Sequence, residues 1–315
     1  MVEQRLHIAV GVVVSRAGHE VLIARRHPQS HQGGLWEFPG GKRQPGESRY
    51  AALCRELEEE LGIHVLAAHP LRCFDFAYPD QAVRLDVWAV DDWEGTPRGN
   101  EGQAIRWMDT AVLDPAGFPA ANGRIIRDLA LPELYFITPD CEDYGAGFLE
   151  GLESVLRSGV RLLRLRSTNL AGQARRRALE QAAALCDRYG GALLGSGPAD
   201  NKVAGVRGLH LDGRTLMQLE ARPAYEPAWV AASCHNLEEL QQAARLALDF
   251  CVLGPVKPTA SHPGGTVLGW ERFAELAAAA TIPVYALGGL NPDDLETARR
   301  HGAHGVALIS ALWKR

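Results

Sequence analysis

The first 131 residues alternate short apolar runs with polar loops, which is the pattern of β-strands. The runs cover residues 6–14, 20–25, 71–78, 83–90 and 104–109. A polar loop at residues 94–103 precedes the last run, and residues 123–131 have the spacing of a short closing helix. These elements predict a mixed α+β domain over residues 1–131.

From residue 132 onward the rhythm changes, and short apolar runs alternate with helical stretches. The runs cover residues 134–138, 161–167, 192–196, 208–211, 229–234, 250–254, 283–289 and 305–310. Helical patterns such as residues 237–248 lie between most of them, so parallel βα units are expected. Eight such units favour a closed (β/α)8 barrel of the TIM type over an open sheet. Residues 132–315 are therefore predicted to form a second domain.

A helix is predicted between Ser48, a residue type that caps helix N-termini, and Gly62, a residue type that ends helices. Residues three and four positions apart share one face of a helix. Leu53, Leu57 and Leu61 therefore form an apolar stripe, which is expected to face the core.

The same helix concentrates negative charge beside this stripe. Glu56, Glu59 and Glu60 cluster on a neighbouring face, whereas Glu58 points elsewhere. Adjacent carboxylates repel one another, and a divalent cation offsets the repulsion. Carboxylate oxygens suit Mg²⁺, with Mn²⁺ as a substitute ion. The alternative is a solvated acidic face that Arg55 neutralises.

Composition narrows the class of protein. The formal net charge of −5 gives no basic footprint for a nucleic-acid polymer, although a single nucleotide can still bind. Six cysteines are scattered without a CxxC pair, so reduced thiols are expected. The chain shows no signal peptide and no run of about 20 apolar residues. These features predict a cytoplasmic protein that binds no membrane, and they leave its oligomeric state open.

The spacing around the acidic helix is specific. Gly41 is followed after five residues by Glu47, and after seven more by the run RELEEELGI at residues 55–63. This pattern resembles the Nudix box, the signature of hydrolases that act on nucleoside diphosphates linked to another moiety. The resemblance implies that metal ions neutralise phosphate charge and lower the pKa of bound water, which attacks phosphorus. A nearby carboxylate would take the proton.

The resemblance also assigns roles to individual residues. The implied metal ligands are Gly41, through its carbonyl, and Glu56, Glu59 and Glu60. The three glutamates are also the implied catalytic residues, together with Arg55, which would orient a glutamate by ion pairing. Glu47 would support the helix and the metal site.

The surroundings of the box resemble MutT-type Nudix hydrolases, which convert 8-oxo-dGTP to the monophosphate and pyrophosphate. The matching segments are IAVG (8–11), Arg25-Arg26, LWEFPGGK (35–42), WEGTPRGNEGQ (93–103) and FPAAN (118–122). The resemblance implies that Arg26 contacts the phosphates or sugar and that Phe38 lies near the base pocket. Asn122 would read the purine edge, because a side-chain amide offers both a donor and an acceptor. Glu101 would be a further metal ligand from a loop.

Each of these four residues has a plainer interpretation. Phe38, which is predicted to lie in a strand, could belong to the core. Asn122 could cap the short helix that follows it. Arg26 and Glu101 could be surface charges.

The second half resembles the thiamine phosphate synthase and TenI family of small (β/α)8 barrels. The matching segments are HLDGRTL (210–216), SCHNLEEL (233–240), LGPVKPTASHPGG (253–265), IPVYALGGLNP (282–292) and GAHGVALIS (302–310). Phosphate in such barrels often lies at the loops after strands seven and eight. The implied phosphate-binding residues are Gly288, Gly289 and Ser310, with Lys257 and Thr259 at the same mouth.

The chain departs from the synthases at three places. Ser196, in the run LLGSGP, stands where synthases carry an Asn-Asp pair, Thr215 where they carry an aspartate, and His262 where they carry a lysine. The first two changes remove magnesium ligands, so synthase activity is not expected. A TenI-like role needs no metal. His235 would be its acid or base, or else a histidine hydrogen-bonded at a strand end.

The leading hypothesis joins two activities. A magnesium-dependent pyrophosphohydrolase would remove 8-oxo-dGTP, and a TenI-like barrel would bind or isomerise a thiazole or thiamine-related phosphate. Two alternatives stay open. The Nudix domain could instead hydrolyse a thiamine-related pyrophosphate, or the barrel could act only as a ligand-binding regulatory module.

Overall fold

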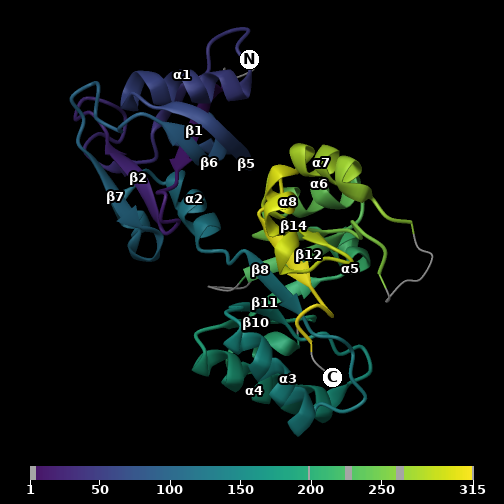
Figure 1. The fold of residues 1–315 in the computed structure, drawn as a ribbon. Coiled ribbons are helices and arrows are strands. Elements are labelled where there is room, and N and C mark those ends of the chain that lie inside the picture. The colour runs from purple at the N-terminus through teal and green to yellow at the C-terminus, as the bar shows by residue number, and fades with distance from the viewer. Residues whose placement is uncertain (1–4, 198, 224–228, 260–265, 314–315) are drawn as a thin grey trace. The chain divides into compact units, whose positions relative to one another are not determined.

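The computed structural model describes residues 5–197, 199–223, 229–259 and 266–313 (Figure 1). Contacts between Cα atoms divide the chain into two compact units, Met1–Leu131 and Pro132–Arg315. Each unit encloses hydrophobic core residues of its own.

As far as the structure describes it, the first unit holds two β-sheets and two α-helices. One sheet has the strand order β4-β1-β6-β5 and the other the order β3-β2-β7. The strands are β1 (Leu6–Val13), β2 (Glu20–Arg25), β3 (Trp36–Glu37), β4 (Gly40–Lys42), β5 (His64–Ala77), β6 (Ala82–Glu94) and β7 (Ile105–Asp109). The helices are α1 (Arg49–Leu61) and α2 (Asn122–Leu129), with 3-10 turns at Thr110–Val112 and Pro115–Gly117.

The five strands expected in this unit are present, and two short strands join them. The strand expected at residues 71–78 begins earlier, at His64. β3 and β4 contain two and three residues, which is too few for an alternating pattern. Phe38 lies between them rather than in a strand, which corrects its expected position. The chain passes there from one sheet to the other, because β3 pairs with β2 and β4 pairs with β1.

α1 forms as predicted, between a side-chain cap and a glycine. The Ser48 hydroxyl accepts a hydrogen bond from a main-chain N–H of the first turn, and Gly62 ends the helix with a φ of 67°. Leu53, Leu57 and Leu61 are completely buried. The helix contacts both β1 and β4, so its acidic face lies beside the glycine-rich strand β4.

The second unit is a closed barrel of eight parallel strands, in which β8 pairs with both β15 and β9. The strands are β8 (Leu134–Ile137), β9 (Leu162–Arg164), β10 (Ala192–Gly195), β11 (Val206–Leu211), β12 (Trp229–Cys234), β13 (Phe250–Leu253), β14 (Val284–Leu287) and β15 (Gly305–Leu308). The predicted fold class, an α+β domain followed by a (β/α)8 barrel, is thus confirmed.

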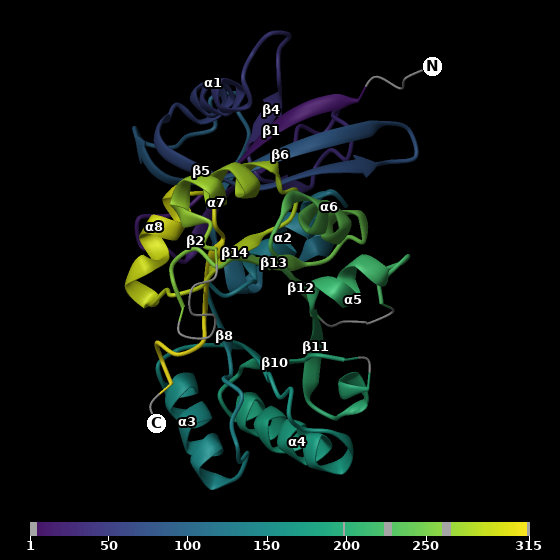
Figure 2. The ribbon, with the colours of Figure 1, turned by 90° about the vertical axis from the view of Figure 1, so that its right-hand side faces the viewer.

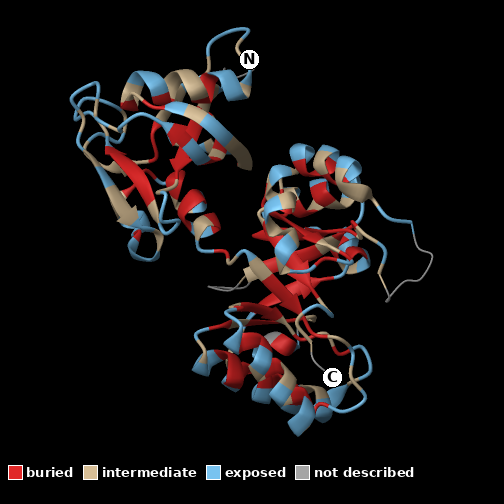
Figure 3. Cartoon of the chain, viewed as in Figure 1, coloured by how far each residue is buried: buried red, intermediate tan, exposed pale blue. Residues whose placement is uncertain are grey.

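Helices surround the barrel strands. They are α3 (Ala146–Arg157), α4 (Gly172–Arg188), α5 (Gly213–Gln218), α6 (Leu237–Arg245), α7 (Gly269–Ala279) and α8 (Leu295–Arg300), with 3-10 turns at Asp200–Lys202 and Pro292–Asp294. Figure 2 shows α6 and α7 on one side of the barrel and α3 and α4 on the other. The strands are almost entirely buried, whereas the helices expose their outer faces (Figure 3). All eight strands are parallel, so their C-terminal ends meet at one mouth, where such barrels carry their sites.

Within the described ranges, no helix combines the length and the hydrophobicity needed to cross a membrane.

Candidate functional site

One arginine organises most of the acidic face of α1. Arg55 Nε donates to Glu47 Oε1 at 2.9 Å, and its Nη1 donates to Glu56 Oε1 at 2.8 Å and Glu59 Oε2 at 2.9 Å. Its hydrogen bond to Glu47 is the main reason why the pKa of Arg55 is raised and that of Glu47 is lowered. Glu58 lies apart from this group, with its Oε1 3.7 Å from His64 Nδ1.

Glu60 lies on the other side of the cluster, against β4. Its Oε2 accepts a hydrogen bond from Gly40 N at 3.0 Å. Burial, reinforced by the charges of Glu37, Glu101 and Glu56, raises the pKa of Glu60 to about 8. Burial also raises the pKa of Glu56. The site therefore holds more carboxylates than its own cations neutralise.

The donor set fits a magnesium ion in its chemistry. Burial and the repulsion between neighbouring carboxylates raise the pKa values of Glu56 and Glu60. A bound divalent cation would offset this repulsion. Gly41 lies so close to the helix that a Cβ there would be 2.2 Å from Glu56 Oε2. Among the described residues, no three acidic, histidine or cysteine side chains already converge on one point. Arg55 holds Glu56 and Glu59 in this structure, so metal binding requires these side chains to rearrange.

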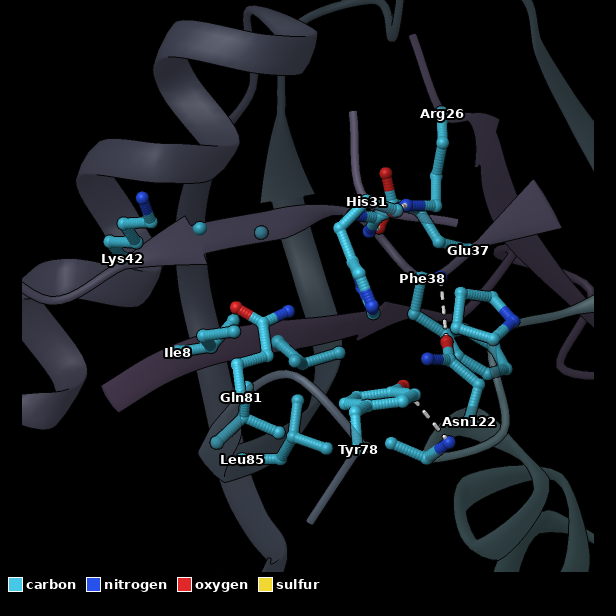
Figure 4. Close-up of a pocket in the computed structure, with 16 residues that line it drawn as sticks. Ile8, Arg26, His31, Glu37, Phe38, Lys42, Tyr78, Gln81, Leu85 and Asn122 are labelled. Atoms are coloured by element: carbon cyan, nitrogen blue, oxygen red, sulfur yellow. Dashed lines mark hydrogen bonds and ion pairs between the residues drawn. The ribbon is translucent and has the colours of Figure 1, made fainter. Parts of the chain in front are cut away.

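A pocket opens next to this cluster (Figure 4). Its lining residues are Ile8, Val10, Arg26, His31, Glu37, Phe38, Gly40, Gly41, Lys42, Tyr78, Gln81, Val83, Leu85, Pro119, Ala121 and Asn122. The pocket thus runs from Asn122 at the start of α2 to Gly40 and Gly41, which touch Glu60 and Glu56. The structure brings Arg26, Phe38, Asn122 and the main chain of Gly41 into one pocket.

Asn122 and Phe38 form one end of the pocket. Asn122 Oδ1 accepts a hydrogen bond from Phe38 N at 3.4 Å. The N-cap of α2 is Ala121, without a side-chain cap, so the interpretation of Asn122 as a helix cap is wrong. Phe38 is buried and stacks on Phe118 with ring centroids 5.7 Å apart. Phe38 therefore belongs both to the core and to the pocket wall.

Arg26 is tied into the pocket wall by Glu37. The two side chains form a hydrogen-bonded ion pair, and Arg26 Nε also donates to His31 O at 2.9 Å. Burial raises the pKa of Glu37 despite this pair. Sequence reasoning missed Glu37, although a carboxylate between Trp36 and Phe38 is a usable signal of a buried charge. Glu101, in contrast, is exposed. Its negative charge contributes to the raised pKa of Glu60.

Three of the barrel residues expected to bind phosphate lie together. Lys257 N donates to Gly288 O at 3.0 Å, and a Cβ on Gly289 would lie 2.4 Å from Pro258 O. Gly288 and Gly289 have φ of 107° and 64°, which favours glycine. Lys257 Nζ lies 2.6 Å from Asp294 Oδ1. The lysine and the two glycines therefore form one unit.

The remaining barrel candidates differ in exposure. Ser310 is exposed after β15, and Thr259 is half-buried at the end of a described range. His235 is exposed, and its Nδ1 lies 3.0 Å from Glu239 Oε2, which also accepts from His235 N at 2.6 Å. His262 lies outside the described residues.

The polar residues that replace the synthase acids take structural partners. Ser196 N donates to Asp200 Oδ2 at 2.7 Å, and Thr215 N donates to Asp212 Oδ1 at 2.7 Å. Ser196 Oγ also accepts from Arg164 Nε at 3.2 Å. Sequence reasoning missed Arg164, whose signal was a charge inside the apolar run RLLRLRS.

Known proteins resemble the two halves separately. Residues 9–128 match the family described as NUDIX domain, and residues 134–312 match the family described as thiamine monophosphate synthase. The 8-oxo-dGTP diphosphatase of Escherichia coli (strain K12) is 38% identical over 126 residues, which are 40% of this chain and 97% of that protein. The CTP pyrophosphohydrolase of the same organism is 41% identical over 128 residues, 39% of this chain and 94% of that protein. The thiamine-phosphate synthase of Thioalkalivibrio sulfidiphilus (strain HL-EbGR7) is 30% identical over 189 residues, 58% of this chain and 88% of that protein.

Proposed function

We propose that this chain, which belongs to the Nudix family in residues 9–128 and to the thiamine monophosphate synthase family in residues 134–312, hydrolyses nucleoside triphosphates to a monophosphate and pyrophosphate. Its preferred substrate is 8-oxo-dGTP and its cofactor is Mg²⁺, for which Mn²⁺ can substitute. The barrel binds or isomerises a thiazole or thiamine-related phosphate.

The observation that supports the proposal for the first unit is that a single pocket extends from a side-chain amide to the acidic cluster. Its lining includes an amide at one end, Asn122, and the main chain of Gly40 and Gly41 at the other. Those glycines touch Glu60 and Glu56. A nucleotide whose base contacts the amide would therefore direct its phosphates toward the carboxylates.

The carboxylates supply the chemistry at that end. Glu56, Glu59, Glu60, Glu101 and the Gly41 carbonyl would hold the metal, which supplies charge neutralisation for phosphate and acidifies bound water. Arg55 holds two of these glutamates before the substrate binds. Burial keeps the proton affinity of the Glu56 carboxylate above that of a solvated glutamate, so it is suited to accept a proton from attacking water.

Asn122 supports the choice of base. The N7 atom of 8-oxoguanine carries a hydrogen, whereas N7 of guanine has a lone pair. Asn122 Oδ1 uses one lone pair for Phe38 N and keeps a second that can accept the N7 hydrogen. Its NH₂ can donate to O6 of the same base. An unmodified guanine would place two acceptors against each other, which disfavours its binding.

Cytosine is the second candidate base, because the CTP pyrophosphohydrolase is the more identical of the two relatives. The edge of cytosine also presents one donor and one acceptor, so the Asn122 amide can form two hydrogen bonds with either base. A thiamine-related pyrophosphate is the third candidate, suggested by the fused barrel.

Product analysis tests the reaction. The purified chain is incubated with 8-oxo-dGTP and magnesium, and the products are identified by ³¹P NMR. Pyrophosphate and the monophosphate are expected from the wild type, whereas Glu56→Gln should leave the substrate intact. Release of inorganic phosphate with the diphosphate, or full turnover by the variant, would refute the proposed reaction.

The barrel proposal rests on Lys257, Gly288 and Gly289 at the mouth. Main-chain amides and a lysine bind phosphate without a metal, which agrees with the loss of synthase-type carboxylates at Ser196 and Thr215. His235 is the proposed acid or base. Calorimetry with thiazole and pyrimidine phosphates tests this role. Tight binding without turnover would favour a regulatory module, and no binding to either compound would remove the proposal.

A further inference from the structure

A charged side chain reaches the inside of the barrel at its mouth. Arg164 is the last residue of β9. Its charge acts on two buried groups: it adds to the burial that lowers the pKa of His210, and it opposes the burial that raises the pKa of Tyr135. Tyr135 in β8 contacts the rings of His210 in β11 and Tyr285 in β14. Neither β11 nor β14 pairs with β8, so these ring contacts cross the barrel interior. Leu163 and Leu165 pack with residues of the surrounding helices, so Arg164 between them faces the interior.

Arg164 lacks the acidic partner that its neighbours have. Arg166 Nε lies 3.2 Å from Asp140, and Arg175 Nη2 lies 2.6 Å from Asp200. For Arg164, the described residues offer one hydrogen bond, from Nε to Ser196 Oγ at 3.2 Å, and no ion pair. Burial lowers the pKa of Arg164. A partly buried cation without an ion-pair partner is unfavourable for the fold.

Two nearby groups do not neutralise it. Asp212 is close enough for its charge to favour the charged form of Arg164, but it makes no ion pair with it, and its Oδ1 caps α5 through Thr215 N. His210 is fully buried between Tyr135 OH, 2.7 Å from its Nδ1, and Ser233 Oγ, 2.8 Å from its Nε2. Burial and the charge of Arg164 lower the pKa of His210, so this ring is neutral and supplies no anion.

We propose that Arg164 is an anion-recognition residue of the barrel, and that the barrel ligand carries a carboxylate or phosphate group that docks on its guanidinium. The planar guanidinium binds either oxyanion through two parallel hydrogen bonds. The proposal rests on the barrel being a ligand-binding domain, but on neither the thiazole chemistry nor the glycine loop of β14.

The experiment uses the full chain, labelled with ¹⁵N-arginine, in EDTA. Inorganic phosphate and acetate are the probes, and Arg164→Gln identifies the Nε–H resonance of Arg164 by its absence. Arg207→Gln is the matched control, because it removes one barrel charge from a mostly exposed side chain paired with Asp187. We expect one of the two anions to shift the Arg164 resonance saturably. A shift with acetate would indicate a carboxylate site, and a shift with phosphate would indicate a phosphate site. In calorimetry, Arg164→Gln should weaken the effective probe by about tenfold or more.

Stability gives a second readout. Without either anion, Arg164→Gln should melt at the same temperature as the wild type or higher, because it removes a desolvated charge, and the effective anion should raise the melting temperature of the wild type alone. An unchanged Arg164 resonance at saturating phosphate and acetate would overturn the proposal. Gly289→Ala separates the two barrel sites. Loss of phosphate binding in Gly289→Ala, with normal binding in Arg164→Gln, would support the glycine loop and refute the role of Arg164.

Discussion

Glu60 gives the most quantitative prediction for the first unit. Its pKa in the folded chain is about 8, against an ordinary value of 4.5. Between these two pH values the folded state binds more protons than the unfolded state. The free energy of unfolding of the metal-free chain therefore falls as the pH rises from about 5 to 8.

The size of the effect follows from the two pKa values. The difference between about 8 and 4.5, at 1.36 kcal/mol per pH unit, corresponds to about 5 kcal/mol across the whole window. Most of this loss falls between pH 5 and pH 7, where Glu60 is still protonated in the folded chain. Magnesium should reverse the sign, because the metal binds the carboxylate form. Magnesium binding at pH 7 should release about one proton.

Urea denaturation at several pH values in EDTA measures the effect. Glu60→Gln replaces the protonated carboxyl with a neutral amide of the same shape, so the barrel contribution cancels in the difference between the two proteins. The wild type should lose stability relative to Glu60→Gln as the pH rises from 5 to 8. Glu58→Gln is the control, because Glu58 is exposed, and it should follow the wild type. Parallel stability curves for the wild type and Glu60→Gln would refute the reasoning.

Further predictions test the other parts of the site. Glu56→Gln should lower turnover by about a thousandfold without changing the melting temperature, whereas Glu58→Gln should keep wild-type activity in the same assay. Gly41→Ala should lose activity and bind magnesium less tightly in calorimetry, because its Cβ would lie 2.2 Å from Glu56 Oε2. Asn122→Ala should reduce the ratio of kcat/KM for 8-oxo-dGTP to that for dGTP by about 10–100-fold; an unchanged ratio would remove its base-reading role. Leu57→Ala should lower the free energy of unfolding by about 2–5 kcal/mol in urea, because Leu57 is fully buried.

The elements predicted well are those whose signals are local. Helix α1 carries its own cap, its own stop and a leucine stripe, so its bounds and its buried face follow from neighbouring positions. The barrel strands are short apolar runs between helices, and their number indicated closure. β3 and β4 were not predicted, because strands of two and three residues are too short to show an alternation of apolar and polar residues.

The motif in α1 indicated which acidic residues cluster, whereas contacts between distant segments left no local signal in the sequence. Asn122 and Phe38 are 84 positions apart, and their hydrogen bond depends on how α2 packs. The Arg26–Glu37 pair requires the β2–β3 hairpin, which the pattern does not reveal. Arg164 is identified because it makes no ion pair among the described residues, and only the closed barrel shows which acids lie near it.

The central claim is that the first unit selects an oxidised purine nucleotide. The most direct test compares kcat/KM for 8-oxo-dGTP, dGTP, CTP and thiamine pyrophosphate in the presence of magnesium, with Glu56→Gln measured in parallel. A preference for 8-oxo-dGTP over every other substrate, lost in Glu56→Gln, is the predicted result. A preference for CTP or thiamine pyrophosphate would contradict the claim and show that the pocket around Asn122 recognises a different ring.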